Sequence, residues 1–560
     1  MKITSLLYLT SVGIFAGSLQ LPLARAADLT WNGGNSSWTD SGAWLLDGSS
    51  ADWINGSSAL FQTGSTLIVG SGISAAGLLY EGAAVTLNGG SLTLAGNASG
   101  SNGGSATLSG TALTLNSANQ EDRWTVRDTS LSGSSTLTKT GNGTVTLSGT
   151  HTANGTWNIN AGTLVFTGTR DITGGGQINI ASGAVLDASG GRLFHAANYA
   201  SNWEQPTITL NGGTLKLNQF GYNSASLGCL QNNFYALKFS SGTTSRVIIS
   251  QGYESGGTGS RGIYIAGWGT TAVIELGANQ TFTWSSSNGQ NFDSIVCESG
   301  AGSALQLDVG ENSVFNFDQK FANKNTANEY GAPTTSNFSG LSLIKSGSGE
   351  LVIKRANTIS SGRVVRVDAG KLTLDVDNAF GTGSGLGGVN IASGALLSMN
   401  GHTLNNTIEV VSGATLDMGG SSYASLVNWH EGGILLNTEN NKGTLNIMTR
   451  TELELGAKSW AGSVVTDTDT VFTLTTNQNL GALGAAVNCW IGGRGNNNTL
   501  QSISFTGGHD INIDNYGAKW AVILSENVTF QDTGDLTFSN NAADMTDTDA
   551  LYGPAISASG

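Results

Sequence analysis

The sequence predicts an all-β protein and, within that class, a parallel β-helix (β-solenoid) with looped-out insertions. Three observations support this. The 560 residues include 81 glycines and only 4 prolines, yet 39% of them are hydrophobic, which is too apolar for a disordered glycine-rich chain. Val, Ile, Leu and Phe lie in short alternating runs between turns, as in strands. The turns also recur at a long, fairly even spacing.

The spacing of the turn glycines distinguishes a β-helix from other all-β folds. The glycines of the clearest turns are Gly162, Gly183 and Gly212, and then Gly370, Gly394 and Gly413. Their gaps are 21, 29, 24 and 19 residues within the two groups. A hairpin meander has a turn signal about every 8 to 12 residues. A longer gap is typical of one coil with two or three short strands, although a β-sandwich remains an alternative.

Two segments about two hundred residues apart repeat one pattern. Leu137-Thr-Lys-Thr-Gly-Asn-Gly-Thr-Val-Thr-Leu147 leads into Asn160-Ala-Gly-Thr-Leu-Val-Phe166. Leu343-Ile-Lys-Ser-Gly-Ser-Gly-Glu-Leu-Val-Ile353 leads into Asp368-Ala-Gly-Lys-Leu-Thr-Leu374. Each copy has a Lys before a Gly-x-Gly turn, an alternating strand, a polar loop and an Ala-Gly-x-Leu strand. Such repeats build a rod in which each coil contacts only its neighbours.

The rest of the chain divides around this rod. Residues 1–26 read as a signal peptide, with Lys2, an apolar run and a small-x-small cleavage pattern at Ala24-Arg25-Ala26. Residues 27–58 form a Trp-rich N-terminal cap, and residues 59–560 form the β-helix. Two stretches, 192–206 and 286–340, are longer and more polar and are predicted to be protruding loops, where binding residues usually lie.

The tryptophans of the cap allow two interpretations. Trp31, Trp38, Trp44 and Trp53 lie close together in the sequence. They would cover the open end of the core, or they would form a platform on which sugars stack. Trp31 and Trp38, together with Trp203 in the first predicted loop, are therefore the candidate ligand contacts.

The search for catalytic chemistry yields little. The net charge of −15 argues against nucleic acid as a partner. Three widely separated cysteines do not form a disulfide framework, and the five histidines lack metal spacing. A polysaccharide-active enzyme would need a close pair of acids, and the candidate pairs are Asp375 with Asp377 and Asp467 with Asp469. Asp544, Asp547 and Asp549 are spaced as the oxygen ligands of a calcium site are. We expect no catalytic residue, no cofactor and no metal site.

The repeated pattern resembles the autotransporter-associated β-strand repeat. Residues 137–166 match it closely, whereas residues 343–374 depart at Ile344, Glu350 and Lys354. Residues 538–541 and 552–556 have a weaker similarity to repeats of polymorphic outer-membrane proteins. The resemblance implies a right-handed parallel β-helix passenger at the surface of, or secreted from, a Gram-negative-type bacterium.

The resemblance also sets the functional expectations. An autotransporter ends in a translocator barrel, and residues 1–560 show none, so we expect a barrel encoded separately or beyond this sequence. The predicted function is a non-enzymatic adhesin or scaffold, whose partners would be host or matrix glycans or proteins and an outer-membrane translocator barrel. The alternatives are a β-helical polysaccharide lyase or hydrolase and a carbohydrate-binding protein.

Overall fold

The computed structural model describes most of the chain from residue 27 to residue 558. Outside the description lie residues 1–26, 35, 171–175, 192, 194–206, 218–236, 241, 250–262, 266–268, 286–293, 298–301, 324–340, 420–422, 431–432, 437–443, 448–450, 456–458, 461–462, 467–469, 475–477, 481–488, 493–502, 507, 509, 515–520, 526–527, 531–533, 540–554 and 559–560. The predicted signal peptide, Trp203 and the acids at 467, 469, 544, 547 and 549 fall there.

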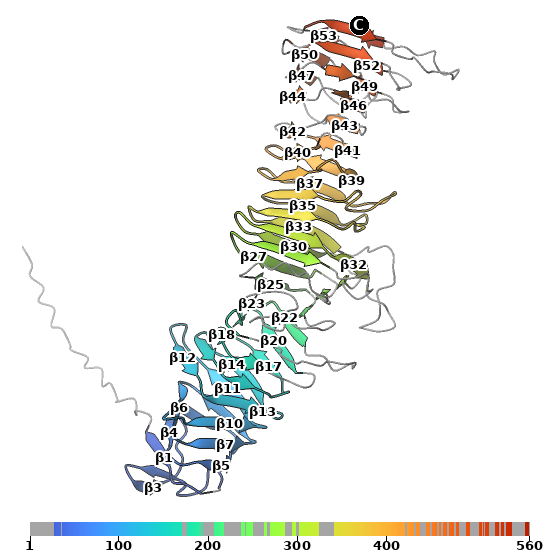
Figure 1. Ribbon diagram of the computed structural model, residues 1–560. Helices are drawn as coiled ribbons and strands as arrows, with labels where there is room; N and C mark the ends of the chain where they lie inside the picture. Colours follow the sequence, from blue (N-terminus) through green and yellow to red (C-terminus); the bar gives the residue numbers. More distant parts are fainter. Residues whose placement is uncertain are drawn as a thin grey trace, which may run out of the picture.

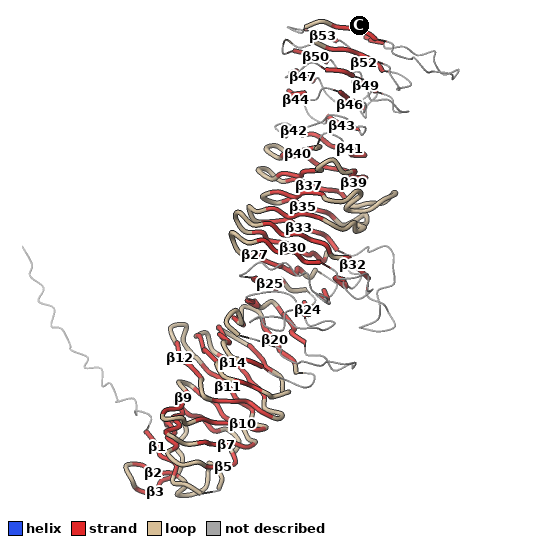
Figure 2. The backbone as a smooth tube through the Cα atoms, in the orientation of Figure 1, coloured by secondary structure: helices blue, strands red, loops and turns tan. Residues whose placement is uncertain are grey.

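The described residues form a long rod of stacked coils (Figure 1). Figure 2 shows strands and loops along it, and these residues include no helix that could cross a membrane. In the lower half most coils run through three faces in turn. Strands on each face pair in parallel with those of the coils below and above. The predicted parallel β-helix is therefore confirmed.

Face 1 is the first side of each lower coil. Its strands are β6 (Ile73–Glu81, first half), β8 (Ser91–Leu94), β11 (Ala112–Asn116), β14 (Thr136–Thr140), β17 (Trp157–Ile159), β20 (Gln177–Ala181), β22 (Thr207–Asn211), β24 (Leu237–Phe239), β26 (Ile263–Ile265), β29 (Ser294–Cys297) and β32 (Lys320–Asn323).

Face 2 continues along the whole rod. Its strands are β4 (Ser57–Phe61), the second half of β6, β9 (Ala98–Ser101), β12 (Arg123–Val126), β15 (Thr144–Leu147), β18 (Thr163–Phe166), β21 (Val185–Asp187), β23 (Thr214–Leu217), β25 (Thr244–Ile249), β27 (Thr271–Leu276), β30 (Ser303–Val309), β33 (Leu341–Ser346), β35 (Val364–Val367), β37 (Gly388–Ile391), β39 (Thr403–Val410), β41 (Tyr423–Trp429), β43 (Thr444–Ile447), β46 (Ser463–Thr466), β49 (Cys489–Gly492), β52 (Ala521–Ser525) and β55 (Ala555–Ala558).

Face 3 follows face 2 in most coils and is divided into several sheets. Among the described residues, no face 3 strand follows β21, β23 or β25. Its strands are β5 (Ser65–Ile68), β7 (Ala84–Asn88), β10 (Ser105–Ser109), β13 (Thr129–Ser132), β16 (Thr150–His151), β19 (Thr169–Arg170), β28 (Thr281–Ser285), β31 (Val314–Asp318), β34 (Glu350–Ile353), β36 (Lys371–Leu374), β38 (Leu396–Ser398), β40 (Thr415–Asp417), β42 (Ile434–Leu436), β44 (Thr451–Leu455), β47 (Thr470–Leu474), β50 (Ile503–Thr506) and β53 (Val528–Phe530). The last coils add a further sheet of β45 (Ser459–Trp460), β48 (Gln478–Leu480), β51 (Ile511–Asp514) and β54 (Leu536–Ser539).

The core is built from every second residue of each strand, because successive side chains of a strand point to opposite faces. On face 1 the inward positions stack in register from coil to coil and are at most 1% exposed: Leu92, Leu113, Leu137, Trp157, Ile178 and Ile208. Leu164 is fully buried on face 2, as predicted. Leu215 and Leu217 are likewise buried, while Lys216 between them is exposed.

The predicted coil of about twenty residues is confirmed by the strand register. Thr144 lies beside Thr163 and Thr163 lies beside Val185. The turn glycines Gly162, Gly183 and Gly212 all have positive φ, which lets the chain bend without a Cβ clash.

The lower end of the rod is closed by an antiparallel hairpin. β1 (Asp28–Trp31) pairs in parallel with β4 and antiparallel with β2 (Trp44–Leu46), which pairs with β3 (Ser49–Ala51). The change of direction interrupts the parallel ladder at an edge that would otherwise be open to further strands.

One expectation about the loops is wrong. Residues 286–340 were predicted to protrude as a single loop, but they contain β29, β30, β31 and β32, which pair with the strands of the neighbouring coils. The polar residues of this stretch, such as Gln306, Asp308 and Asn316, occupy outward positions of strands. They weaken the apolar signal without removing the period of two.

Candidate functional site

The two copies of the repeat each fold into two consecutive coils. In the first copy (137–166), β14 and β15 form one coil and β17 and β18 form the next. In the second copy (343–374), β33 and β34 lie below β35 and β36. The pattern has moved by one face between them, because its first strand lies on face 1 in the first copy and on face 2 in the second.

The lysine of the first copy points into the rod. Lys139 follows the buried Leu137 by two residues, so strand geometry turns its side chain inward, and the residue is 0% exposed. Its ammonium nitrogen Nζ donates hydrogen bonds to the backbone oxygens of Thr140 at 2.8 Å, Gly141 at 2.8 Å and Ala161 at 3.0 Å. Two acceptors belong to the turn after the lysine, and the third belongs to the next coil.

The lysine of the second copy makes the same three contacts. Lys345 is 0% exposed, and its Nζ donates to the backbone oxygens of Ser346 at 2.8 Å, Gly347 at 2.7 Å and Ala369 at 3.0 Å. We call this arrangement the lysine clamp. It joins the Gly-x-Gly turn of one coil to the Ala-Gly turn of the coil above.

The electrostatics of the clamp follow from burial and complete hydrogen bonding. An ammonium group has three donors, and each finds a carbonyl oxygen. Burial lowers the pKa of Lys139 to about 8. Burial also lowers the pKa of Lys345 to about 8, against the opposing effect of the Asp308 charge. Both lysines therefore remain cations at neutral pH.

The glycines of the pattern allow the two turns to stack. A Cβ on Gly162 would lie 2.4 Å from the carbonyl oxygen of Gly143 and 2.5 Å from that of Gly141. A Cβ on Gly370 would lie 2.5 Å from the carbonyl oxygens of Gly347 and Gly349. The close approach of these backbones brings the third carbonyl within reach of the lysine.

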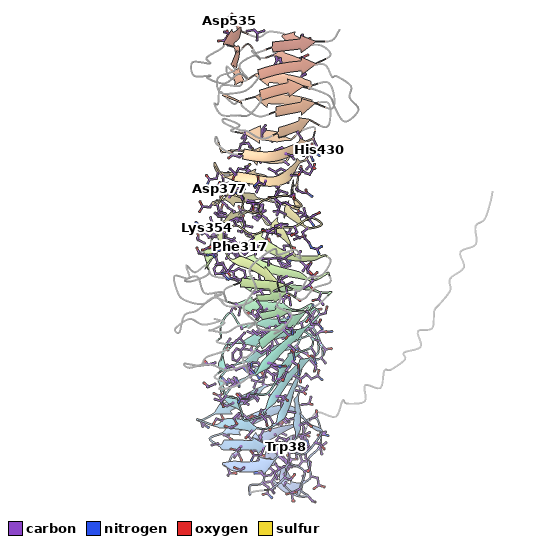
Figure 3. The ribbon with its side chains drawn as sticks, turned by 90° about the vertical axis from the view of Figure 1, so that its right-hand side faces the viewer. Trp38, Phe317, Lys354, Asp377, His430 and Asp535 are labelled. Carbon is purple, nitrogen blue, oxygen red and sulfur yellow. The ribbon has the colours of Figure 1, made fainter. Side chains whose placement is uncertain are left out.

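Three tryptophans of the cap, Trp31, Trp38 and Trp44, lie in the core, and Trp53 packs against it partly buried. Trp38 is 0% exposed and Trp31 is 3% exposed. The ring centroids of Trp38 and Trp44 are 5.0 Å apart, and those of Trp31 and Trp44 are 5.2 Å apart. The ring centroid of Trp53 lies 5.1 Å from that of Trp38, which Figure 3 shows at the lower end of the rod. Trp31 and Trp38 therefore present no open ring face on which a sugar could stack.

The described candidate acids have structural partners. Asp375 accepts a hydrogen bond from Lys354 Nζ at 3.0 Å. Asp377 accepts from the Thr403 backbone N–H at 2.9 Å and lies 3.2 Å from His402 Nδ1. The hydrogen bond from Thr403 and then that from His402 lower the pKa of Asp377. Figure 3 shows Lys354 and Asp377 in the upper part of the rod.

No metal site is found among the residues that the structure describes. These residues include no group of three or more His, Cys, Asp or Glu side chains that could hold an ion. Asp375 and Asp377 each make a contact to another coil, through Lys354 and through Thr403 and His402.

The comparisons with known proteins bear on the first copy. The Passenger-associated-transport-repeat family matches residues 137–166, the two coils joined by the Lys139 clamp. The predicted autotransporter-passenger repeat is therefore confirmed in this segment. Searches of curated proteins and of solved structures gave no significant match.

The sequence contained a sign of the clamp that its interpretation missed. Lys139 and Lys345 occupy positions where the alternation demands an inward side chain. A lysine there requires several acceptors, and the residue after the lysine and the first glycine of the adjoining Gly-x-Gly turn supply two of them.

Proposed function

We propose that the chain is the passenger of an exported, autotransporter-type protein and acts as a non-enzymatic adhesin or scaffold. The observation that carries this proposal is the passenger-associated repeat at residues 137–166, folded as two coils of a continuous rod. Each coil contacts only its neighbours, so the core supports length while the outward side chains remain available to partners. Host or matrix glycans or proteins are the proposed partners, with an outer-membrane barrel as translocator.

Localisation tests the export part of the proposal. Antibodies against the purified rod should label intact cells of the source bacterium or detect the protein in the culture medium. Added protease should remove the cell-bound signal without degrading a cytoplasmic marker. A signal found only after the cells are lysed would contradict export.

The chemical alternative is a β-helical polysaccharide lyase or hydrolase. The pairing of Asp375 with Lys354 and of Asp377 with Thr403 supports a structural role for these acids. Purified protein incubated with uronate-containing polysaccharides should produce no ultraviolet absorbance from new double bonds, and with neutral polysaccharides no reducing ends. Release of either product above that of a heat-denatured sample would overturn the non-enzymatic assignment.

A further inference from the structure

Face 1 of the lower rod has a continuous row of outward side chains without charge. Each member lies beside the next in the parallel register, and each is partly exposed. We call these residues the neutral row: Ser74, Thr93, Thr114, Thr138, Asn158, Asn179 and Thr209. The next strand places Lys238 beside Thr209, and this lysine ends the row.

The outward positions beside the neutral row are also uncharged. On β8, β11 and β14 they are Ser91, Ala112, Asn116, Thr136 and Thr140. On β20 and β22 they are Gln177, Ala181 and Asn211. Face 1 therefore presents hydroxyl and amide groups over several coils and no formal charge from β8 to β22.

Two cross-strand hydrogen bonds hold parts of this surface in fixed orientations. Asn179 Nδ2 donates to Asn158 Oδ1 at 2.9 Å, and Thr140 Oγ1 donates to Asn116 Oδ1 at 3.3 Å. An amide has two N–H donors and a carbonyl with two lone pairs, so each asparagine keeps capacity for a further partner. Because the side chains are already ordered, a ligand would lose less entropy in fixing them.

The charge distribution selects the kind of partner. The chain carries a net charge of −15, so a polyanion approaching the rod is repelled. Higher on the rod the outward positions carry ion pairs such as Glu350 with Lys371 and Lys354 with Asp375. A neutral, hydroxyl-rich ligand could bind face 1 without removing water from a charged group, which avoids a large desolvation cost. The threonine and asparagine side chains both donate and accept hydrogen bonds, as the hydroxyls of such a ligand do.

The spacing of the row favours a polymer. Strands in a sheet lie about 4.8 Å apart, so a ligand extended along the rod meets one member of the neutral row in each coil. Figure 1 shows β11, β14, β17 and β20 stacked along the lower half of the rod. We propose that face 1 between β8 and β22 binds a neutral polysaccharide that lies along the rod axis. This inference rests on the proposed function, in which the outward faces make the contacts.

The test is affinity electrophoresis of the purified protein in native gels that contain dextran, hydroxyethylcellulose or galactomannan. Alginate and hyaluronan serve as anionic probes. We expect retardation by at least one neutral polymer and by neither anionic one. The triple variant Thr93→Val, Thr114→Val and Thr138→Val removes three hydroxyls from the neutral row while keeping the branched shape. It should weaken binding by about tenfold or more, since each hydroxyl contributes a hydrogen bond.

A matched control removes three hydroxyls from face 2 of the same region: Thr125→Val, Thr144→Val and Thr146→Val. It should bind the neutral polymer as the parent does, and both variants should melt near the parent temperature. Equal losses in the two variants, full binding by the face 1 variant, or no retardation by any neutral polymer would overturn the inference. None of these results would alter the localisation test, so a failure of glycan binding is distinguishable from a failure of export.

Discussion

The two copies of the repeat share their interior and differ in their surface. In both, a buried lysine binds two carbonyls of its own turn and one of the next coil. The outward positions of the first copy, such as Thr144 and Thr146, are uncharged. In the second copy Glu350 and Lys371 form an ion pair at 3.0 Å between the two coils. Turn chemistry and core are retained while the surface changes.

Two of the three departures of the second copy from the repeat pattern are matched by nearby partners. Glu350 stands where the pattern has threonine, and Lys371 lies beside it in the next coil. Lys354 stands where the pattern has a small residue, and its Nζ lies 3.0 Å from Asp375. Outward substitutions are therefore compensated across one coil spacing, whereas inward positions offer no such freedom because each contacts the packed core.

The largest effect should come from a charge placed in the core of either copy. Leu164→Asp and Leu372→Asp each bury an unpaired carboxylate at a position that is 0% exposed. We expect each to lower the free energy of unfolding by about 4 kcal/mol or more, measured by urea denaturation. Thr146→Asp, on an outward position of the first copy, should change the free energy of unfolding by less than about 1 kcal/mol. Parent-like melting of Leu164→Asp would refute the inward assignment.

Removal of the clamp should have a smaller effect of similar size in the two copies. Lys139→Met leaves the carbonyls of Gly141 and Ala161 without the lysine donor, and relief of the buried charge offsets part of that cost. We expect Lys139→Met and Lys345→Met each to lose about 1 to 3 kcal/mol. Lys354→Met, which removes an exposed ion pair, should lose less than about 1 kcal/mol. Unchanged or raised stability in both clamp variants would show that the lysine does not stabilise the coil pair.

The clamps should also impose a pH dependence. The pKa of each lysine in the folded chain is about 8, below the ordinary lysine pKa of 10.5, so between these pH values the unfolded chain binds more protons than the folded one. The stability of the parent should therefore rise from pH 8 to pH 10.5 relative to the double variant Lys139→Met and Lys345→Met. Denaturation of both proteins at several pH values measures the difference. A difference that falls over this range would contradict the lowered pKa.

The smallest effect should come from restoring the repeat pattern on the surface. Burial would raise the pKa of Glu350, but hydrogen bonds from Thr373 and Lys371 and the charge of Lys371 bring it below its ordinary value. Because the pair is partly exposed, Glu350→Thr should cost less than about 1 kcal/mol. Adding Lys371→Thr should recover part of that cost, which thermal unfolding of the single and double variants would show. A loss of unfolding free energy as large as that of Lys139→Met would mean that the outward residues of the repeat contribute to stability as much as the inward ones.

The coil was predictable from the sequence because it depends on local features. Gly162 and Gly183 mark turns through positive φ, and alternation marks the side of each strand that faces the core. The clamp was only partly predictable, since the third acceptor, Ala161, comes from a coil whose position relative to Lys139 depends on stacking.

The other differences between the sequence-based predictions and the structure have similar physical reasons. Outward Gln306 and Asp308 dilute the apolar pattern of the stretch 286–340, so the sequence predicts a loop where the structure has strands that pair in register. The sequence leaves open whether the tryptophans of the cap cover the core or face solvent, because their burial depends on the packing of Trp38 against Trp44 and Trp53.

The shift of the repeat by one face between its two copies has a consequence for how such a rod presents its surface. Face 2 continues without interruption past the place where the shift occurs, so the scaffold itself does not rotate. What changes is the face of the rod on which a given position of the pattern lies. Adding one strand between two copies would therefore place the later copy on a different face of the rod, while the stack of coils continues unchanged.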